Sequence, residues 1–297
     1  MAESRGSSAP LKGIACMVAG GAFLTANDAV LKMLTGGYPV GQLMFLRGMF
    51  VMLPITYFVW RAGGLNALVI HSFRAHAMRA AVMIAGTYLF VSGLKYLPLA
   101  DAISIAFAGP LFVTALAPVM LGERVGWRRW MAVLAGFVGI LIIFRPGGSV
   151  FQWAALFPLA ASCTGAMRDI LTRKFSATET SEALLFYSTV GVALGGLLSL
   201  PVVDWQPVSG RDWGFLVLNG LLIGGAHYLM IETFRYAEAA LASPFKYTTV
   251  IWATLLGYLM FGDVPEATTF IGGGVVVASG IFILHRERQQ RRAAQKL

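Results

Sequence analysis

Residues 88–124 read YLFVSGLKYLPLADAISIAFAGPLFVTALAPVMLGER, and residues 228–264 read YLMIETFRYAEAALASPFKYTTVIWATLLGYLMFGDV. The two stretches align without a gap at an offset of 140 residues. A basic residue followed by tyrosine recurs at Lys95 and Arg235, and a glycine followed by an acid recurs at Gly122 and Gly262. Paired features at one fixed offset indicate a duplicated half-protein, which has to be recognised before a fold is assigned.

The composition is typical of a helical membrane protein. Of the 297 residues, 57% are hydrophobic and only 12% are charged, whereas a soluble domain has about 25% charged residues. Apolar runs of about 20 residues, the length that crosses a bilayer as a helix, follow one another along the chain. Ten spans are predicted, at 12–31, 40–60, 77–96, 99–121, 128–145, 152–172, 182–201, 214–236, 241–261 and 266–285.

The basic residues predict the orientation of these spans. With the N-terminus in the cytoplasm, cytoplasmic segments hold sixteen Lys and Arg residues and outer segments hold four. Basic residues collect in cytoplasmic loops, so both termini are expected there. The same rule accounts for the net charge of +9 without a nucleic-acid partner. We expect a multi-pass protein of a bacterial inner membrane.

The number of spans gives the repeat a direction. Five spans in each half are an odd number, so the second half enters the membrane upside down. At an offset of 141 residues, Asp28 meets Asp169 and Phe45 meets Phe186, which extends the match into the first helices. The predicted fold is therefore an all-α membrane protein of ten transmembrane helices, arranged as two inverted five-helix repeats around a central cavity. The predicted units are residues 1–147, residues 148–287 and a cytoplasmic basic tail, 288–297.

The segment 96–147 resembles the EamA family of the drug/metabolite transporter superfamily. The Ala-rich start of 99–121, Pro110, the Leu-Gly-Glu sequence at 121–123 and the glycines of 128–145 support the resemblance, which extends over about 12–285. The second copy departs from the pattern, with Val250 in the place of Pro110. The resemblance implies ten helices, a cavity between the halves, and transport of amino acids, other metabolites or drugs.

Two opposite charges in the second half are candidates for substrate binding. Folding 214–236 against 241–261 puts Glu232 and Lys246 at about the same depth, and ionisable residues at membrane depth are commonly functional. Their first-half equivalents are Ser92 and Ala106, so the scaffold does not demand either charge. A structural ion pair, or a lysine that extends to the interface, is the alternative.

A second set of charges is a candidate for gating or coupling. Asp28 and Arg47 are expected at a similar depth, and Asp169 is the repeat equivalent of Asp28. The two acids would act as gates at opposite ends of the cavity. The simpler interpretation is that each acid forms a helix-end ion pair with the basic residue four positions later, Lys32 or Arg173.

Aromatic side chains are predicted to line the cavity. At one position, both repeats have a phenylalanine or a tyrosine, and at another position both repeats have an aromatic residue. The substrate-binding candidates are Tyr88, Phe107, Tyr247 and Trp252. His227 is a further candidate, although a packing role is equally compatible with its position. Pro110 and Pro244 are expected to kink their helices and to free backbone carbonyls near the cavity.

These features predict a secondary transporter that works by alternating access, and not an enzyme. We expect export of small organic metabolites, with amino acids first because a Lys–Glu site could hold a zwitterion. The alternative within this class is uptake or exchange of a larger flat metabolite such as a flavin or nucleotide. The alternative from another class is an intramembrane enzyme acting on lipid, but no nucleophile–base pair is evident.

No cofactor or metal is predicted. Cys16 and Cys163 lie in apolar runs, and His71 and His76 have poor spacing for one helical face. The expected partners are a small-molecule substrate and the lipid bilayer, without nucleic acid. Small residues in 128–145 and 266–285 permit a helix contact there, so both a monomer and a homodimer are compatible with the sequence.

Overall fold

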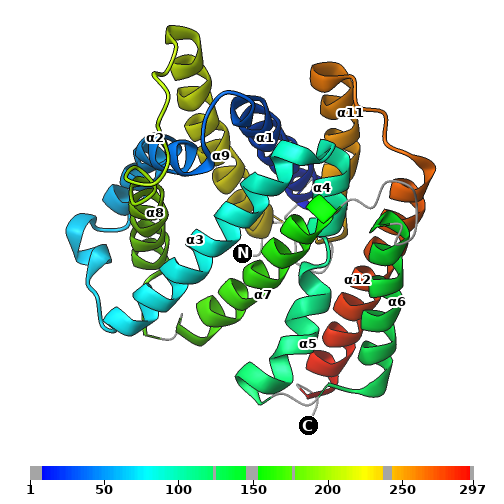
Figure 1. Cartoon of the computed structure of the whole chain (residues 1–297). Helices are drawn as coiled ribbons and strands as arrows, with labels where there is room; N and C mark the ends of the chain where they lie inside the picture. The colour runs from blue at the N-terminus through cyan, green and yellow to red at the C-terminus, as the bar shows by residue number, and fades with distance from the viewer. Residues whose placement is uncertain (1–8, 123–124, 145–152, 176–177, 237–242, 295–297) are drawn as a thin grey trace.

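The structure is a computed structural model that describes residues 9–122, 125–144, 153–175, 178–236 and 243–294. Its regular elements are helices (Figure 1). In chain order they are α1 (Ala9–Thr35), α2 (Val40–Arg61), η1 (Gly64–Leu68), α3 (Phe73–Tyr96), α4 (Leu99–Ala106), α5 (Gly109–Leu121), α6 (Trp127–Phe144), η2 (Trp153–Ala155), α7 (Leu156–Phe175), α8 (Ser181–Leu197), α9 (Gly210–Tyr236), η3 (Ser243–Thr248), α11 (Thr249–Phe261) and α12 (Ala267–Ala294).

Each predicted span overlaps a helical segment. Among the described residues, five segments are long and apolar enough to cross a membrane: Leu11–Thr35, Val40–Arg61, Phe73–Tyr96, Leu99–Leu121 and Gly210–Met230. Two shorter apolar helices are Glu182–Leu197 and Ala267–Ile283. The prediction of an all-helical, multi-pass membrane protein is confirmed at this level.

The repeated glycine explains why two helices end where they do. Gly122 follows α5 and Gly262 follows α11, with backbone φ angles of +68° and +70°. This left-handed conformation turns the chain out of a helix and is unfavourable for residues with a Cβ atom. The glycines therefore match across the repeat because each ends an equivalent helix.

The predicted kinks are present as interruptions. The span 99–121 divides into α4 and α5, and Pro110 lies in the first turn of α5, where a missing N–H costs no hydrogen bond. The described part of the span 241–261 starts with the 3-10 helix η3, which contains Pro244, and continues as α11. Both interrupted segments belong to the stretches that define the repeat.

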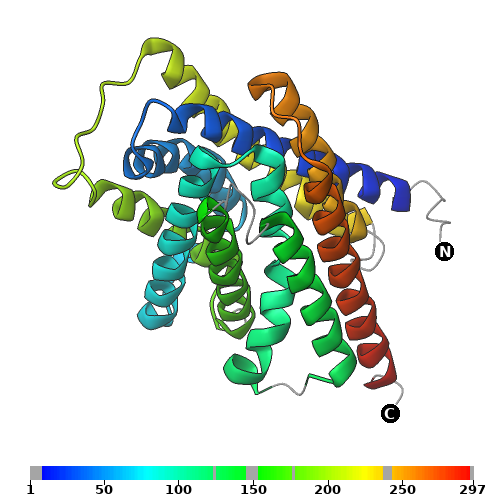
Figure 2. The ribbon, with the colours of Figure 1, turned by 45° about the vertical axis from the view of Figure 1, so that its right-hand side comes forward.

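Helices from different halves of the sequence pack against one another. α1 lies along α9 and α3 lies along α7, while α2 contacts α8. α6 and α12 run side by side, as Figures 1 and 2 show. The α1–α9 and α3–α7 contacts correspond to one another when the two halves of the sequence are exchanged.

Two glycines allow α6 and α12 to approach closely. A Cβ atom added to Gly139 would lie 2.7 Å from the carbonyl oxygen of Gly272, and one added to Gly272 would lie 2.4 Å from that of Gly139. Small residues at such a crossing replace side-chain bulk with backbone contact. Small residues in these two helices are compatible with a contact between two chains. At this crossing, they form a contact within one chain.

Candidate functional site

A buried polar cluster joins α1, α2 and α9. The side-chain nitrogen of Asn219 donates to the carbonyl oxygen of Asn27 at 2.9 Å, and that of Asn27 donates to Asp28 at 3.0 Å. The carboxylate of Asp28 and the guanidinium of Arg47 attract one another. The charges of Asp28 and Arg47 therefore act on one another, and the two asparagines complete what we call the Asn27–Asp28 cluster.

Two amide oxygens of this cluster are buried acceptors. Asn27 and Asn219 are both fully buried, and the Oδ1 atom of each is without a hydrogen bond among the residues described. A buried acceptor left unsatisfied costs about 1–3 kcal/mol. A ligand that brings N–H or O–H donors to the Asn27–Asp28 cluster would recover that cost.

The sequence equivalents of these four residues also meet, on the other side of the repeat. Asn27, Asp28, Arg47 and Asn219 correspond, at offsets of 141 or 140, to Arg168, Asp169, Ser188 and Arg79. We call these four the Arg79–Asp169 cluster.

Arg79 anchors the Arg79–Asp169 cluster to α7 and α8. Its guanidinium donates to Thr172 at 2.9 Å, to the carbonyl oxygen of Leu184 at 2.6 Å and to the hydroxyl of Ser188. Arg168 forms an ion pair with Asp169 at 2.7 Å. Asp169 is exposed, whereas Asp28 is half-buried. The two repeat-related acids therefore differ in access to solvent, although the residues around them correspond.

Lys246 approaches the Arg79–Asp169 cluster. It is attracted by Asp169 and repelled by Arg168, and its side chain is exposed. Glu232 is buried, and no ion pair joins it to Lys246 among the described residues. The side chain of Glu232 is therefore buried and that of Lys246 exposed, and the charges of Asp169 and Arg168 act on Lys246.

The predicted aromatic residues occupy defined places. The rings of Phe107 and Tyr247, which share a repeat position, pack with their centroids 4.8 Å apart. The hydroxyl of Tyr88 lies against Gly41, where an added Cβ atom would be 2.5 Å from it. Trp252 has a buried indole N–H without a hydrogen-bond partner among the residues described. A repeat-related aromatic pair and an unused donor both suit an organic ligand.

His227 and Lys32 each interact with a partner that the sequence did not predict. His227 is exposed, and its Nδ1 atom bonds the carbonyl oxygen of Ile223 at 2.8 Å within the same helix. Lys32 forms an ion pair with Asp263 at 3.0 Å, so the predicted pair with Asp28 four residues earlier is wrong. Asp169 pairs with its neighbour Arg168, and the side chain of Arg173 lies outside the part that the structure describes.

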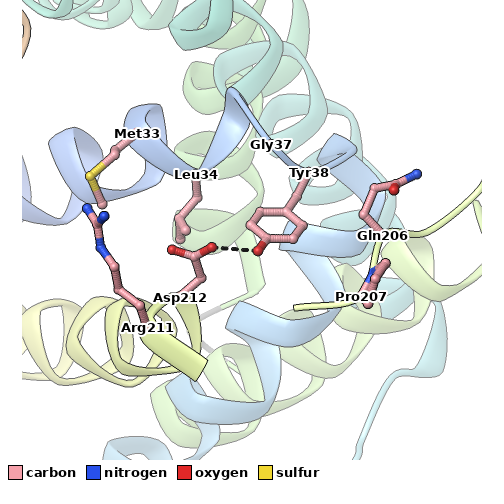
Figure 3. A pocket seen from close by; sticks show the side chains of 8 residues that line it. All are labelled: Met33, Leu34, Gly37, Tyr38, Gln206, Pro207, Arg211 and Asp212. Carbon is pink, nitrogen blue, oxygen red and sulfur yellow. Dashed lines mark hydrogen bonds between the residues drawn. The ribbon is translucent and has the colours of Figure 1, made fainter. Parts of the chain in front are cut away.

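A pocket opens where the α1–α2 turn meets the start of α9. It has a volume of about 310 Å³ and is lined by residues of both segments, including Met33, Tyr38, Gln206, Arg211 and Asp212 (Figure 3). The Tyr38 hydroxyl donates to Asp212 at 2.5 Å and accepts the backbone N–H of Ser209 at 3.2 Å. The pocket lies at the predicted outer end of the molecule.

An equivalent joint lies at the predicted cytoplasmic end. Glu179, whose repeat equivalent is Tyr38, accepts the backbone N–H of Ser72 at 2.5 Å and that of His71 at 3.3 Å, and it bonds Nε2 of His76 at 3.0 Å. Burial opposes the charge of this carboxylate, but these hydrogen bonds outweigh burial and hold the pKa of Glu179 below its ordinary value of 4.5. His71 and His76 share this acid despite their spacing, because His71 lies before α3 and His76 within it.

Sequence reasoning overlooked Asn27, Asn219 and Arg79. Each is a polar residue within a predicted span or at its edge, and that alone marks it as a candidate. Asn219 and Arg79 also share a repeat position, which is a second signal available from the sequence.

Comparison with known proteins agrees with the fold and the repeat. The sequence profile of the EamA-like transporter family matches this chain twice, at residues 11–145 and 152–285. A solved structure with 19% sequence identity superposes with a TM-score of 0.61, over 93% of this chain and 97% of that one. That similarity concerns the fold alone.

Several relatives have names that state a substrate. The S-adenosylmethionine uptake transporter of Rickettsia felis is 27% identical over 270 residues, covering 89% of this chain and 90% of that protein. The riboflavin transporter of Vibrio cholerae is 27% identical over 292 residues, covering 97% of this chain and 98% of that protein. Both similarities extend over nearly the full length of each chain.

Proposed function

Since this chain belongs to the EamA-like transporter family, we propose that it is a secondary transporter of a small metabolite that combines an amino-acid group with a flat ring. The observation that supports this most is that Asp28 and Arg47 attract one another beside two buried amide oxygens without a hydrogen bond among the described residues. A zwitterion presents an ammonium and a carboxylate, and it would find an opposite charge for each at this cluster.

The proposed architecture is the one that permits alternating access. Ten spans form two inverted halves, residues 1–147 and 148–287, followed by a cytoplasmic tail at 288–297. The exchanged contacts, α1 with α9 and α7 with α3, support the inversion. Sixteen basic residues against four support cytoplasmic termini. In this arrangement, Asp28 and Asp169 lie in equivalent clusters nearer opposite ends of the pathway and act as gates.

The aromatic residues would hold the ring of the substrate. An added Cβ atom on Gly21 of α1 would lie 2.8 Å from Thr249, which follows η3 and its Tyr247. Gly21 precedes Asp28 by seven residues, about 10 Å along a helix. That separation suits a metabolite with a charged group at one end and a ring at the other. We propose that the ring contacts Phe107, Tyr247 and the indole N–H of Trp252, which has no hydrogen-bond partner among the described residues.

S-adenosylmethionine has this chemistry, with an amino-acid group and an adenine ring, and one relative is named for its uptake. Amino acids alone would use only the Asn27–Asp28 cluster, so their export, the first expectation from the sequence, is a narrower form of the same proposal. Riboflavin is the second candidate, because a relative is named for it and because its hydroxyls could donate to the Oδ1 atoms of Asn27 and Asn219.

Counterflow in proteoliposomes tests the proposal. Purified protein is reconstituted in liposomes loaded with S-adenosylmethionine, riboflavin or a mixture of amino acids, and uptake of the matching radiolabelled solute is followed. We expect S-adenosylmethionine to drive the fastest uptake and unlabelled amino acids to compete weakly. Uptake with riboflavin alone would replace the first candidate by the second. Labelled solute recovered as a new product, without entry into the liposome, would favour an enzyme.

A further inference from the structure

A basic pocket lies at one end of α6 and α12, away from the clusters discussed above. It has a volume of about 210 Å³ and is lined by Gly126, Trp127, Arg128, Arg129 and Arg286. The first four residues enter or begin α6, and Arg286 lies near the end of α12. Figure 1 shows that the start of α6 and the C-terminus lie at the same end of the molecule.

The described residues that line this pocket carry charge of one sign. Three of these five residues are arginines, and none is acidic. The first turn of α6 contains no acidic residue, so the positive end of its helix dipole adds to the field of the guanidinium groups. Arg128 and Arg286 also lie over the rings of Trp127 and Phe282, at 5.5 and 5.9 Å from the ring centroids. Such a pocket attracts an anion, and arginine suits phosphate oxygens in particular.

An apolar stripe runs from this pocket along α6. Met131, Leu134, Val138 and Leu141 follow at intervals of three or four residues and are 53–57% exposed. This spacing places them on one face of the helix. From Trp127, the stripe covers about 20 Å of helix, which is comparable to one leaflet of the hydrocarbon core with part of its interface. A basic pocket at one end of an exposed apolar stripe is complementary to an anionic lipid, which is charged at one end and apolar along its length.

We propose that this pocket binds the headgroup phosphate of an anionic phospholipid, whose acyl chains lie along Met131, Leu134, Val138 and Leu141. The three arginines belong to segments predicted to be cytoplasmic, and the cytoplasmic leaflet supplies anionic lipids. Trp127 and Trp130, both exposed, are of the type found at the level of the headgroups. The site goes beyond the transport proposal and does not depend on which solute is moved.

Native mass spectrometry of the delipidated full-length protein in detergent tests this site. The protein is titrated with phosphatidylglycerol, with phosphatidylcholine and with inorganic phosphate. We expect one phosphatidylglycerol to bind at least tenfold more tightly than phosphatidylcholine, with an affinity that falls as salt is raised. Equal binding of the two lipids would overturn the proposal. So would binding of inorganic phosphate alone, which would show a site for a soluble anion.

The matched variants remove the same charge from two places. The triple variant R128Q/R129Q/R286Q should weaken phosphatidylglycerol binding by about tenfold or more, since each basic residue near an anionic surface contributes. The control R61Q/R74Q/K174Q removes three exposed basic residues that are also predicted to be cytoplasmic. An equal loss in the control would mean that total charge matters and no pocket exists.

Two further measurements separate binding from folding and from self-association. The variant R128K/R129K/R286K keeps the charge and should recover part of the phosphatidylglycerol affinity, and a single symmetric peak on size exclusion shows that each variant is folded. A dimer of wild-type protein that binds no phosphatidylglycerol would show that a second copy covers the stripe, and would overturn the assignment to lipid.

Discussion

The ammonium of Lys32 lies 3.0 Å from a carboxylate oxygen of Asp263 and 2.5 Å from the carbonyl oxygen of Leu97. It also lies 4.9 Å from the centre of the Phe261 ring. One side chain of α1 thereby ties together the α3–α4 turn and the end of α11, at the predicted outer end of the molecule. The repeat-equivalent residues, Arg173 and Glu123, have the same combination of charges. The two repeats therefore have one basic and one acidic residue at matching positions of the sequence.

The first prediction concerns this ion pair. Asp263→Asn should weaken the contact between α1 and α11, because a neutral amide binds an ammonium less strongly than a carboxylate does. We expect a thiol at position 38, in a chain with Cys16 and Cys163 replaced by alanine, to react several-fold faster with a membrane-impermeant reagent. Asp204→Asn, an exposed acid near the same end, is the control. An unchanged rate would show that the pair does not hold the outer end closed.

The second prediction concerns the proposed zwitterion site. Asp28→Asn and Arg47→Gln should each lower the initial rate of uptake by about tenfold to a hundredfold, because a hydrogen bond to a charged group contributes about 1.5–3 kcal/mol. The loss should come mainly from a higher KM. Lys12→Gln removes an exposed charge from the same helix as Asp28 and should leave the rate unchanged. Wild-type rates in both cluster variants would exclude these residues from substrate binding.

The third prediction concerns the unused donor of Trp252. Trp252→Phe removes a buried N–H that has no partner in the described part of the chain, so the loss of packing should be partly offset and stability should change little. If the N–H donates to substrate, KM should rise by about fivefold. Trp60→Phe alters an exposed tryptophan and provides the control. An unchanged KM for Trp252→Phe would place the indole outside the site.

The fourth prediction concerns the pH dependence of the Glu179 joint. Because the folded pKa lies below the ordinary value of 4.5, ionised Glu179 stabilises the fold above that pH. This stabilisation is lost only as the pH falls through the lower folded pKa. Glu179→Gln should therefore lower Tm by about 5 °C at pH 7 and remove part of the acid destabilisation. Thermal unfolding in detergent at pH 3.5–8 measures both effects, and Glu182→Gln is the control. If the Tm values of Glu179→Gln and wild type changed in parallel with pH, the assignment would be contradicted.

The fifth prediction concerns the crossing of α6 and α12. Gly272→Ala puts a methyl group 2.4 Å from the carbonyl oxygen of Gly139, so the helices must separate. Such overpacking costs about 1–3 kcal/mol. Gly274, two residues later, has open space at its Cβ position, and Gly274→Ala should be neutral or slightly stabilising. Equal Tm values for the two variants would show that the close approach is not tight.

Much of the fold was predictable because it depends on local sequence. The ten apolar runs predicted where the helical segments lie, and the repeated Gly122 and Gly262 marked two helix ends that a left-handed backbone requires. The electrostatic interaction of Asp28 with Arg47 is compatible with the same local reasoning, because a short turn between two helices sets the depth of residues on either side. The family followed from the same stretches.

The partners of the charged side chains were not predictable in this way. Lys32 was expected to pair with Asp28, four residues away, but it pairs with Asp263, which is 231 residues away. Lys246 was expected beside Glu232, and its electrostatic neighbours are Asp169 and Arg168 on α7. A long basic side chain reaches several acids within a helical bundle, and helix packing selects among them.

The sequence by itself determined an all-helical membrane protein built from a duplicated unit, because apolar run length and a fixed offset can be read without knowing how helices pack. Only the tertiary structure decided which polar residues meet. It brought Asn27 and Asn219, which are 192 residues apart, into one buried contact beside Asp28. It also joined α6 and α12 so that Arg128, Arg129 and Arg286 line one pocket. The physical reason is that hydropathy fixes how deep a residue lies in the membrane, whereas its neighbours at that depth depend on how the helices pack.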